Sequence, residues 1–327
     1  MAIHSDQRHS VARPMCCSAA VFVAVLLANR EAPAAPPDKL DQWREQALEL
    51  VNEDRKGEGR EALTLGDALD EAAQFHANDM AKRNYYSHTS PEGNDVQDRF
   101  IDVGGSRWEL VEENIARCSG CRPPITAETI RELEKGWMNS PHHRENILRQ
   151  GISRFGFGIV LDDKDGLYAV QTFAGPGTPR GSEADEAPKV LTSDEISARA
   201  AQLLNQARKK EDVGTFEVSA ALTEVAQSLM PDPASENLSL STGGGLLEAL
   251  PANQRTKWRS LSVVSAACGG CGTRPTLEDL RSFRRQWLDN PQYSQRLLDS
   301  KISAIGFALQ TTGSGRKVAV LVLGQPR

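Results

Sequence analysis

The chain carries an internal repeat in which uncommon residues recur 150 positions further along. A fixed spacing shared by several rare residue types seldom arises by chance, so the chain is predicted to fold as two copies of one domain. The residues related by this shift include cysteine, tryptophan, proline and glycine positions: Cys118 and Cys268, Cys121 and Cys271, Trp137 and Trp287, Pro141 and Pro291, Gly156 and Gly306.

The repeat divides the chain into four predicted segments. A length of 327 residues leaves room for two domains of ordinary size. The predicted segments are a signal peptide at 1–35, a first copy at 39–177, a linker at 178–190 and a second copy at 191–325. The linker is rich in glycine, proline and charged residues, as linkers commonly are.

The N-terminal segment resembles an export signal. Arg8 and Arg13 precede an apolar run from Met15 to Ala28, followed by the small residues Ala32 and Ala34. A span needs about 20 apolar residues, so this run has instead the length of a signal-peptide core. An uncleaved N-terminal anchor is the alternative. The chain is therefore expected to be secreted or associated with the cell envelope, with no transmembrane span after signal removal.

Hydrophobic periodicity predicts an α+β fold. Apolar residues three and four apart predict helices near 40–50 and 69–80, and a third that begins at Thr126 and ends at Pro141. Alternating apolar residues over 155–161 predict a strand with one buried face, and Asp165-Gly166 predicts the turn to a returning strand. Helices followed by a hairpin, twice over, indicate an antiparallel sheet covered by helices.

The overall charge argues against one class of partner. The net charge is −6 and the isoelectric point is about 5.6. Proteins that bind nucleic acids present a basic face, so no nucleic-acid partner is expected.

Six motifs in chain order carry a resemblance to a known family. They are LVNEDRKGEGREALTL, HANDMAKRNYYSHTSPEG, EENIA, GWMNSPHHRENIL, FGFGIVL and YAVQTFAG. Together they resemble the bacterial, SCP-like branch of the CAP superfamily, which includes cysteine-rich secretory proteins, antigen 5 and plant pathogenesis-related proteins. The match covers about residues 48–175, and the second copy is a degenerate repeat.

The resemblance implies a three-layer α-β-α sandwich with a cleft lined by histidines and acidic residues. It assigns the cleft to His88, Glu113 and His143, with His142 and Ser140 in secondary places. Ser140 stands where the family pattern has a second glutamate, so a four-residue metal site is incomplete here. The resemblance also implies an unidentified extracellular or cell-envelope ligand, such as a lipid, a glycan or a protein.

Several chemistries suit His88, Glu113 and His143. Two imidazoles and a carboxylate are ligands that zinc or another divalent cation accepts, and an open position would activate a water. Without metal, the histidines suit a polar or anionic ligand, or acid–base chemistry near neutral pH. A structural polar cluster is the third alternative. The primary interpretation is an extracellular binding module; a metal-dependent, peptidase-like hydrolase and a purely structural domain pair are the alternatives.

The two Cys-x-x-Cys pairs also leave alternatives open. An exported chain favours disulfides Cys118–Cys121 and Cys268–Cys271. One zinc site shared by all four thiolates, or free redox-active thiols, would use the same residues.

The second copy lacks the predicted cleft residues. The 150-residue shift places Leu238, Val263 and Tyr293 at the positions of His88, Glu113 and His143, and Gln292 at that of His142. The second copy is therefore expected to keep the scaffold without the polar site.

Overall fold

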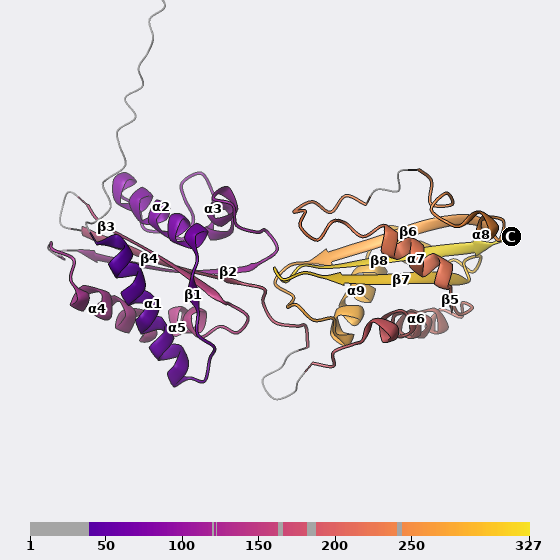
Figure 1. The fold of residues 1–327 in the computed structure, drawn as a ribbon, viewed down its shortest axis with the longest axis horizontal. Coiled ribbons are helices and arrows are strands. Elements are labelled where there is room, and N and C mark those ends of the chain that lie inside the picture. The colour runs from indigo at the N-terminus through magenta and orange to yellow at the C-terminus, as the bar shows by residue number, and fades with distance from the viewer. Residues whose placement is uncertain (1–38, 120, 122, 163–165, 182–187, 241–243) are drawn as a thin grey trace, which may run out of the picture. The chain divides into compact units, whose positions relative to one another are not determined.

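The computed structural model describes residues 39–119, 121, 123–162, 166–181, 188–240 and 244–327. The predicted signal peptide, part of the predicted linker and Asp165 of the predicted turn lie outside these ranges. Two four-stranded sheets are present in the described chain, and each has its own set of helices (Figure 1).

The first copy contains five helices and four strands among its described residues. In chain order they are α1 Leu40–Gly57, β1 Thr64–Leu65, α2 Asp67–Arg83, α3 Val96–Asp102, β2 Leu110–Ser119, α4 Ala127–Met138, α5 Pro141–Ile147, β3 Arg154–Leu161 and β4 Gly166–Gly175. The strand order is β1-β3-β4-β2, so β2 forms one edge of the sheet. The predicted antiparallel pairing holds for β2, β3 and β4, whereas the two-residue β1 pairs with β3 in parallel.

The second copy repeats this arrangement. Its elements are α6 Ser193–Lys210, β5 Glu217–Val218, α7 Ala220–Ser228, α8 Ala252–Arg255, β6 Trp258–Cys268, α9 Leu277–Asp289, α10 Pro291–Leu297, β7 Ala304–Thr311 and β8 Lys317–Pro326. The order β5-β7-β8-β6 is that of the first sheet, with the same parallel pairing at one edge. The α+β class predicted from periodicity is confirmed.

Helices cover both faces of the first sheet, which makes three layers (Figure 1). Phe155, Phe157 and Phe173 pack against α1, α4 and α5 in one core cluster. On the other face, Val160 and Val170 pack against the alanines of α2. The expectation that the strand 155–161 has a single buried face is wrong, because each of its two faces meets a helix layer and nearly every residue is buried.

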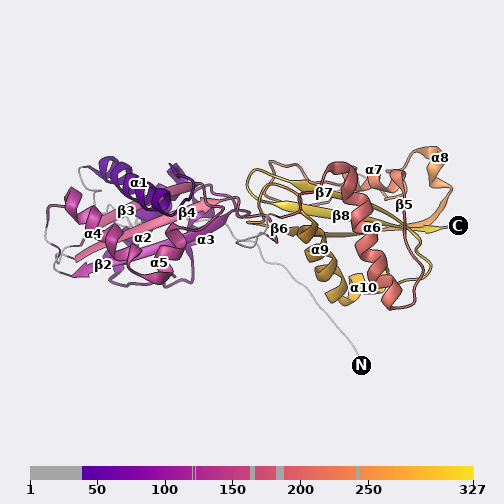
Figure 2. The same ribbon diagram turned by 90° about the horizontal axis from the view of Figure 1, so that it is seen from below.

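The second sheet has the same two-sided cover. Phe283 of α9 and Leu204 of α6 share a cluster with Phe307. On the opposite face, Val225 of α7 packs with Val320. Figure 2 shows α6, α9 and α10 gathered on this copy.

Local sequence signals explain where the helices begin and end around the motif GWMNSPHHRENIL. Thr126, where the sequence predicts the helix to begin, is the N-cap of α4 and forms a capping box with Thr129. Trp137 is buried in the core beside Phe157. Pro141 does not merely follow a helix end, because it is the first residue of a new helix, α5. Proline suits that place, since its ring fixes φ and the first helical residue needs no N–H donor.

Matching buried contacts relate the two copies. Asn52 of α1 donates to and accepts from the Leu63 backbone, and Asn205 of α6 does the same with Phe216. Arg55 donates to the carbonyl of Ile147, the last residue of α5. Arg208 likewise donates to the carbonyl of Leu297, the last residue of α10. The two arginines thus satisfy backbone carbonyls at the ends of equivalent helices in both copies.

Close contact between α2 and β3 predicts that Gly156→Ala destabilises the first copy. A Cβ at Gly156 would lie 2.3 Å from the Leu69 carbonyl carbon, and the backbone there has no room to move aside. We expect a loss of about 1–3 kcal/mol in the free energy of unfolding, measured by urea denaturation. The matched control is Gly136→Ala in α4, where nothing lies within 4 Å of the added Cβ. This control should stabilise by about 0.5–1 kcal/mol, and an unchanged midpoint for Gly156→Ala would contradict the packing.

Candidate functional site

The site is organised by a buried carboxylate on the edge strand β2. The Glu113 side chain is only 2% exposed, and both of its oxygens have partners. Oε1 lies 2.8 Å from Nδ1 of His88, and Oε2 accepts from Arg99 at 2.6 Å. A buried charge without a partner is costly, so the Arg99 guanidinium is what keeps this carboxylate inside the protein.

Two buried side chains hold the segment that carries His88. His76 of α2 lies with Nε2 3.0 Å from the carbonyl oxygen of Ser87, and Arg99 of α3 donates to the carbonyl of His88 at 3.1 Å. Burial lowers the pKa of His76, so its ring is neutral at pH 7 and we assign the proton to Nε2. The backbone around His88 is thus fixed while its ring remains 54% exposed.

His143 enters the site from α5, which two asparagines attach to β2. Asn114 donates to the carbonyl of His143 at 3.2 Å, and Asn146 donates to the carbonyl of Glu113 at 3.1 Å. The two amides also bond to each other at 3.0 Å. His143 is half-buried, and burial lowers its pKa, with smaller contributions from His88 and His142. This ring is therefore neutral at pH 7.

The five predicted cleft residues differ in their contacts and in their exposure. His88 and Glu113 are directly bonded, and His143 is near enough to His88 to interact electrostatically. His142 is exposed on α5. Ser140 is the N-cap residue of α5, but its side chain makes no capping hydrogen bond. Within the described ranges, no group of three or more His, Cys, Asp or Glu side chains is placed to hold a metal ion.

The comparison with protein families decides the identity of this segment. Residues 48–173 match the CAP family, described as the cysteine-rich secretory protein family. The N-terminal copy is a CAP domain. This agrees with the resemblance of the sequence motifs and with the layered fold.

Relatives of this CAP domain occur in bacterial proteins. The chain is 31% identical over 139 residues to the uncharacterized protein YkwD of Bacillus subtilis (strain 168), a match that covers 42% of this chain and 49% of YkwD. It is 30% identical over 128 residues to the uncharacterized membrane protein YlbC of the same strain, covering 39% of this chain and 33% of YlbC. The chain thus spans half or less of these relatives.

A solved structure with similarity is that of an extracellular protein containing a SCP domain from Bacillus anthracis str. Ames. It is 28% identical, covers 43% of this chain and 44% of that chain, and has a TM-score of 0.34. No helix among the described residues of the present chain is long and apolar enough to cross a membrane.

Both Cys-x-x-Cys pairs form disulfides, Cys118–Cys121 at the end of β2 and Cys268–Cys271 at the end of β6. The predicted disulfides are therefore confirmed over the shared zinc site and the free thiols. Each disulfide links residues three apart in sequence, so it restricts the backbone at the end of the edge strand and closes only a short loop.

The sheet register places Val263 of the second copy where the CAP domain has Glu113. Glu113 pairs with Thr172 across β2 and β4, and Val263 pairs with Val322 across β6 and β8. Both pairs lie at the same step of their ladders, counted from the equivalent cysteines. The buried carboxylate that anchors His88 therefore has an apolar counterpart in the second copy.

A buried polar network lies behind the cleft and was not predicted from the sequence. Gln171 of β4 accepts from Asn114 at 3.0 Å and donates to Glu134 of α4 at 2.5 Å. Burial raises the pKa of Glu134 to about 8, and the nearby charge of Asp54 on α1 adds to the rise. Its spacing of three from Trp137 puts it on the buried face of α4, which is the signal that sequence reasoning overlooked.

Glu134 should make stability fall as the pH rises. Its pKa is about 8 in the folded chain and 4.5 in the unfolded chain, so the folded state holds the proton more tightly between these values. Folding stability is therefore lost progressively from about pH 4.5 to pH 8. Glu134→Gln cannot ionise, and its amide oxygen can still accept from Gln171. Relative to wild type, this variant should gain about 1–3 kcal/mol between pH 5 and pH 8.

Urea denaturation at several pH values checks this expectation. Glu132→Gln is the matched control, because Glu132 lies on the same helix with an exposed side chain and should leave the pH dependence as in wild type. Parallel pH profiles for wild type and Glu134→Gln would show that Glu134 ionises normally in the fold.

Proposed function

We propose that the CAP domain is an extracellular binding module that holds a polar ligand between His88 and His143. The observation that carries this proposal is the contrast between the exposed ring of His88 and its buried anchor, Glu113. Orienting an exposed imidazole through a buried carboxylate is typical of histidines that contact a ligand or a metal.

The anchor determines which nitrogen of His88 faces outward. A neutral imidazole bonded to a carboxylate through Nδ1 carries its proton there, so Nε2 keeps its lone pair. His143 is also neutral at pH 7. The proposed ligand is therefore one that donates hydrogen bonds to these imidazoles.

A three-ligand metal centre does not fit the residues as they lie. Glu113 has one oxygen on His88 and the other on Arg99, so neither is free to coordinate a metal. No step of the hydrolase alternative, in which a water is held by His88, Glu113 and His143, follows from this arrangement. Zinc binding stays a prediction, and two imidazoles would be its protein ligands.

Export of the chain belongs to the same proposal. It is supported by the two disulfides, which persist in oxidising compartments, and by the extracellular relative from Bacillus anthracis. The second copy is proposed to be a degenerate CAP-like repeat that serves as a scaffold or recognition surface. Val263 in place of Glu113 supports this part.

Nitrogen-15 NMR of the histidine rings tests the proposed role of Glu113. At pH 7 we expect His88 in the Nδ1–H tautomer in wild type and a mixture of tautomers in Glu113→Gln. Loss of stability alone would not produce this change in a folded variant. A wild-type His88 that carries its proton on Nε2 would contradict the proposal.

Calorimetric titration with zinc tests whether the cleft takes a metal. We expect binding that is lost in His88→Ala and in His143→Ala and retained in His142→Ala, which is the matched control on the same helix. Glu113→Gln should weaken the affinity by about 10- to 100-fold without abolishing it, if Glu113 orients His88 and does not coordinate. If wild type shows no saturable heat of zinc binding, the metal prediction is refuted. The tautomer experiment would then still test whether Glu113 orients His88.

A further inference from the structure

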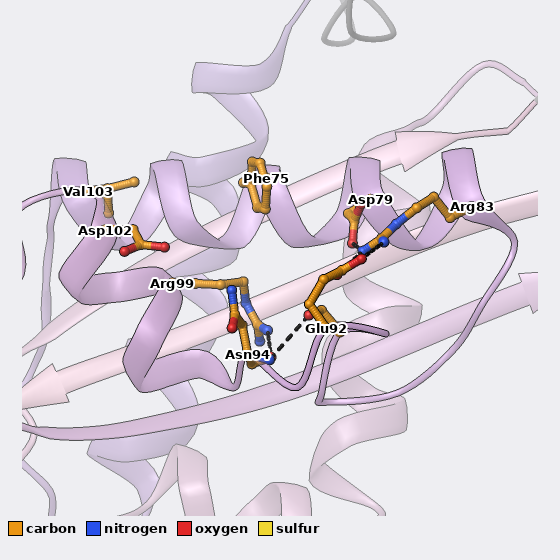
Figure 3. A pocket seen from close by; sticks show the side chains of 9 residues that line it. Phe75, Asp79, Arg83, Glu92, Asn94, Arg99, Asp102 and Val103 are labelled. Carbon is orange, nitrogen blue, oxygen red and sulfur yellow. Dashed lines mark hydrogen bonds and ion pairs between the residues drawn. The ribbon is translucent and has the colours of Figure 1, made fainter. Parts of the chain in front are cut away.

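A cavity of about 190 Å³ lies between α2, α3 and the turn at residues 90–94 of the CAP domain (Figure 3). Arg99 lines it, whereas His88, Glu113 and His143 are not part of its wall. The cavity is therefore distinct from the histidine cleft, although the same arginine borders both.

The wall of this cavity carries more negative than positive charge. Arg83 is paired with both Asp79 and Glu92, so one carboxylate of that group is uncompensated. The hydrogen bond from Arg83 also lowers the pKa of Glu92 to about 2, which keeps it ionised. Arg99 is committed to Glu113. The guanidinium groups at this site thus have no free charge to offer to an anion.

Asp102 adds a carboxylate that has no ion-pair partner among the described residues. It is the last residue of α3, where the free backbone carbonyls of the helix also carry partial negative charge. In Figure 3 Asp102 lies at one end of the cavity, and Asp79, Arg83 and Glu92 lie at the other. A cation inside the cavity would thus be attracted from both ends.

Apolar side chains also line the space between these charges. The ring of Phe75 lies between them in Figure 3 and is 60% exposed, which is unusual for a large aromatic side chain on a helix. Val103 lines the same space. An aromatic face attracts cations and also packs against aliphatic chains, so this surface suits a group with both properties.

We propose that the cavity binds an alkylammonium group, with the ammonium near Asp102 and the aliphatic stem against Phe75 and Val103. A lysine side chain and a free primary amine share this chemistry. The volume fits a single linear group, because pockets for drug-sized ligands run from about 300 to 1,000 Å³. A bare metal ion is disfavoured, because no group of three or more His, Cys, Asp or Glu side chains in the described part of the chain is placed to hold one.

NMR titration of the uniformly nitrogen-15-labelled full-length protein tests the proposal with n-pentylammonium as the probe. Saturable shifts are expected at the backbone amides of Phe75, Asp102 and Val103. Titration with sodium pentanoate or with neutral n-pentanol, which have the same aliphatic chain, should give no saturable shifts. The peptide Gly-Lys-Gly distinguishes the two sources: tighter binding than pentylammonium indicates a lysine side chain, and equal or weaker binding indicates a free amine.

Variants locate the binding in this cavity. Asp102→Asn and Phe75→Ala should each weaken the affinity for pentylammonium by about three- to tenfold. Both positions are exposed, so the fold of each variant should persist. Glu71→Gln removes a charge from exposed α2 surface outside the cavity and is the matched control. His88→Ala should bind as wild type, which keeps this result separate from the histidine cleft. Failure of pentylammonium to saturate, equal binding of pentanoate, or full retention in both Asp102→Asn and Phe75→Ala would overturn the proposal.

Discussion

The buried ion pair between Glu113 and Arg99 is the contact on which the candidate site depends. Glu113 lies on an edge strand, and its charge is tolerated there only because α3 brings a guanidinium within 2.6 Å. Removing Arg99 would leave a buried carboxylate without compensation. Since Arg99 also holds the carbonyl of His88 and borders the cavity beside α2, this one side chain connects the cleft, the loop and the second proposed binding site.

The alternation of side chains along β2 gives the candidate site its two halves. Glu113 projects toward the helices α2 and α3, where it meets His88 and Arg99. Asn114, the next residue, projects toward α5 and α4, where it holds the His143 carbonyl and Gln171. Adjacent residues of a strand point to opposite faces, so the motif EENIA reaches both helix layers at once. That explains how residues from two layers contribute to one site at the edge of the sheet.

The comparison of the two copies separates scaffold from site within one chain. The strand order, the capped helices and the arginines that close the helix ends are common to both copies. Trp137 donates its ring N–H to the carbonyl of Ile115, whereas the same nitrogen of Trp287 has no hydrogen-bond partner among the residues that the structure describes. The second copy therefore keeps the apolar packing of the tryptophan without this polar contact to the strand. The fold tolerates this loss because its stability rests on the apolar faces of the sheets.

Much of the candidate site could be read from local patterns, and some of it could not. The motifs placed His88, Glu113 and His143, and export chemistry pointed to the disulfides that the structure contains. His76 and Arg99 were not assigned roles, because each acts on a backbone carbonyl that is distant in sequence, by 11 residues in both cases. The second buried face of β3 was missed as well, since an alternating apolar pattern does not reveal that glycines at 156 and 158 receive the backbone of α2.

The sequence by itself determined the repeat, the α+β class and the capped start of α4, because these depend on spacing and on local backbone chemistry. The candidate cleft residues came from the resemblance of the motifs to the CAP family. Only the tertiary structure decided the roles within the site. It assigned both oxygens of Glu113 to His88 and Arg99, joined Glu134 to Gln171 in the interior, and set Phe75 among carboxylates at the surface. Charge pairing and desolvation depend on which residues are neighbours in space, and the linear sequence does not specify these neighbours.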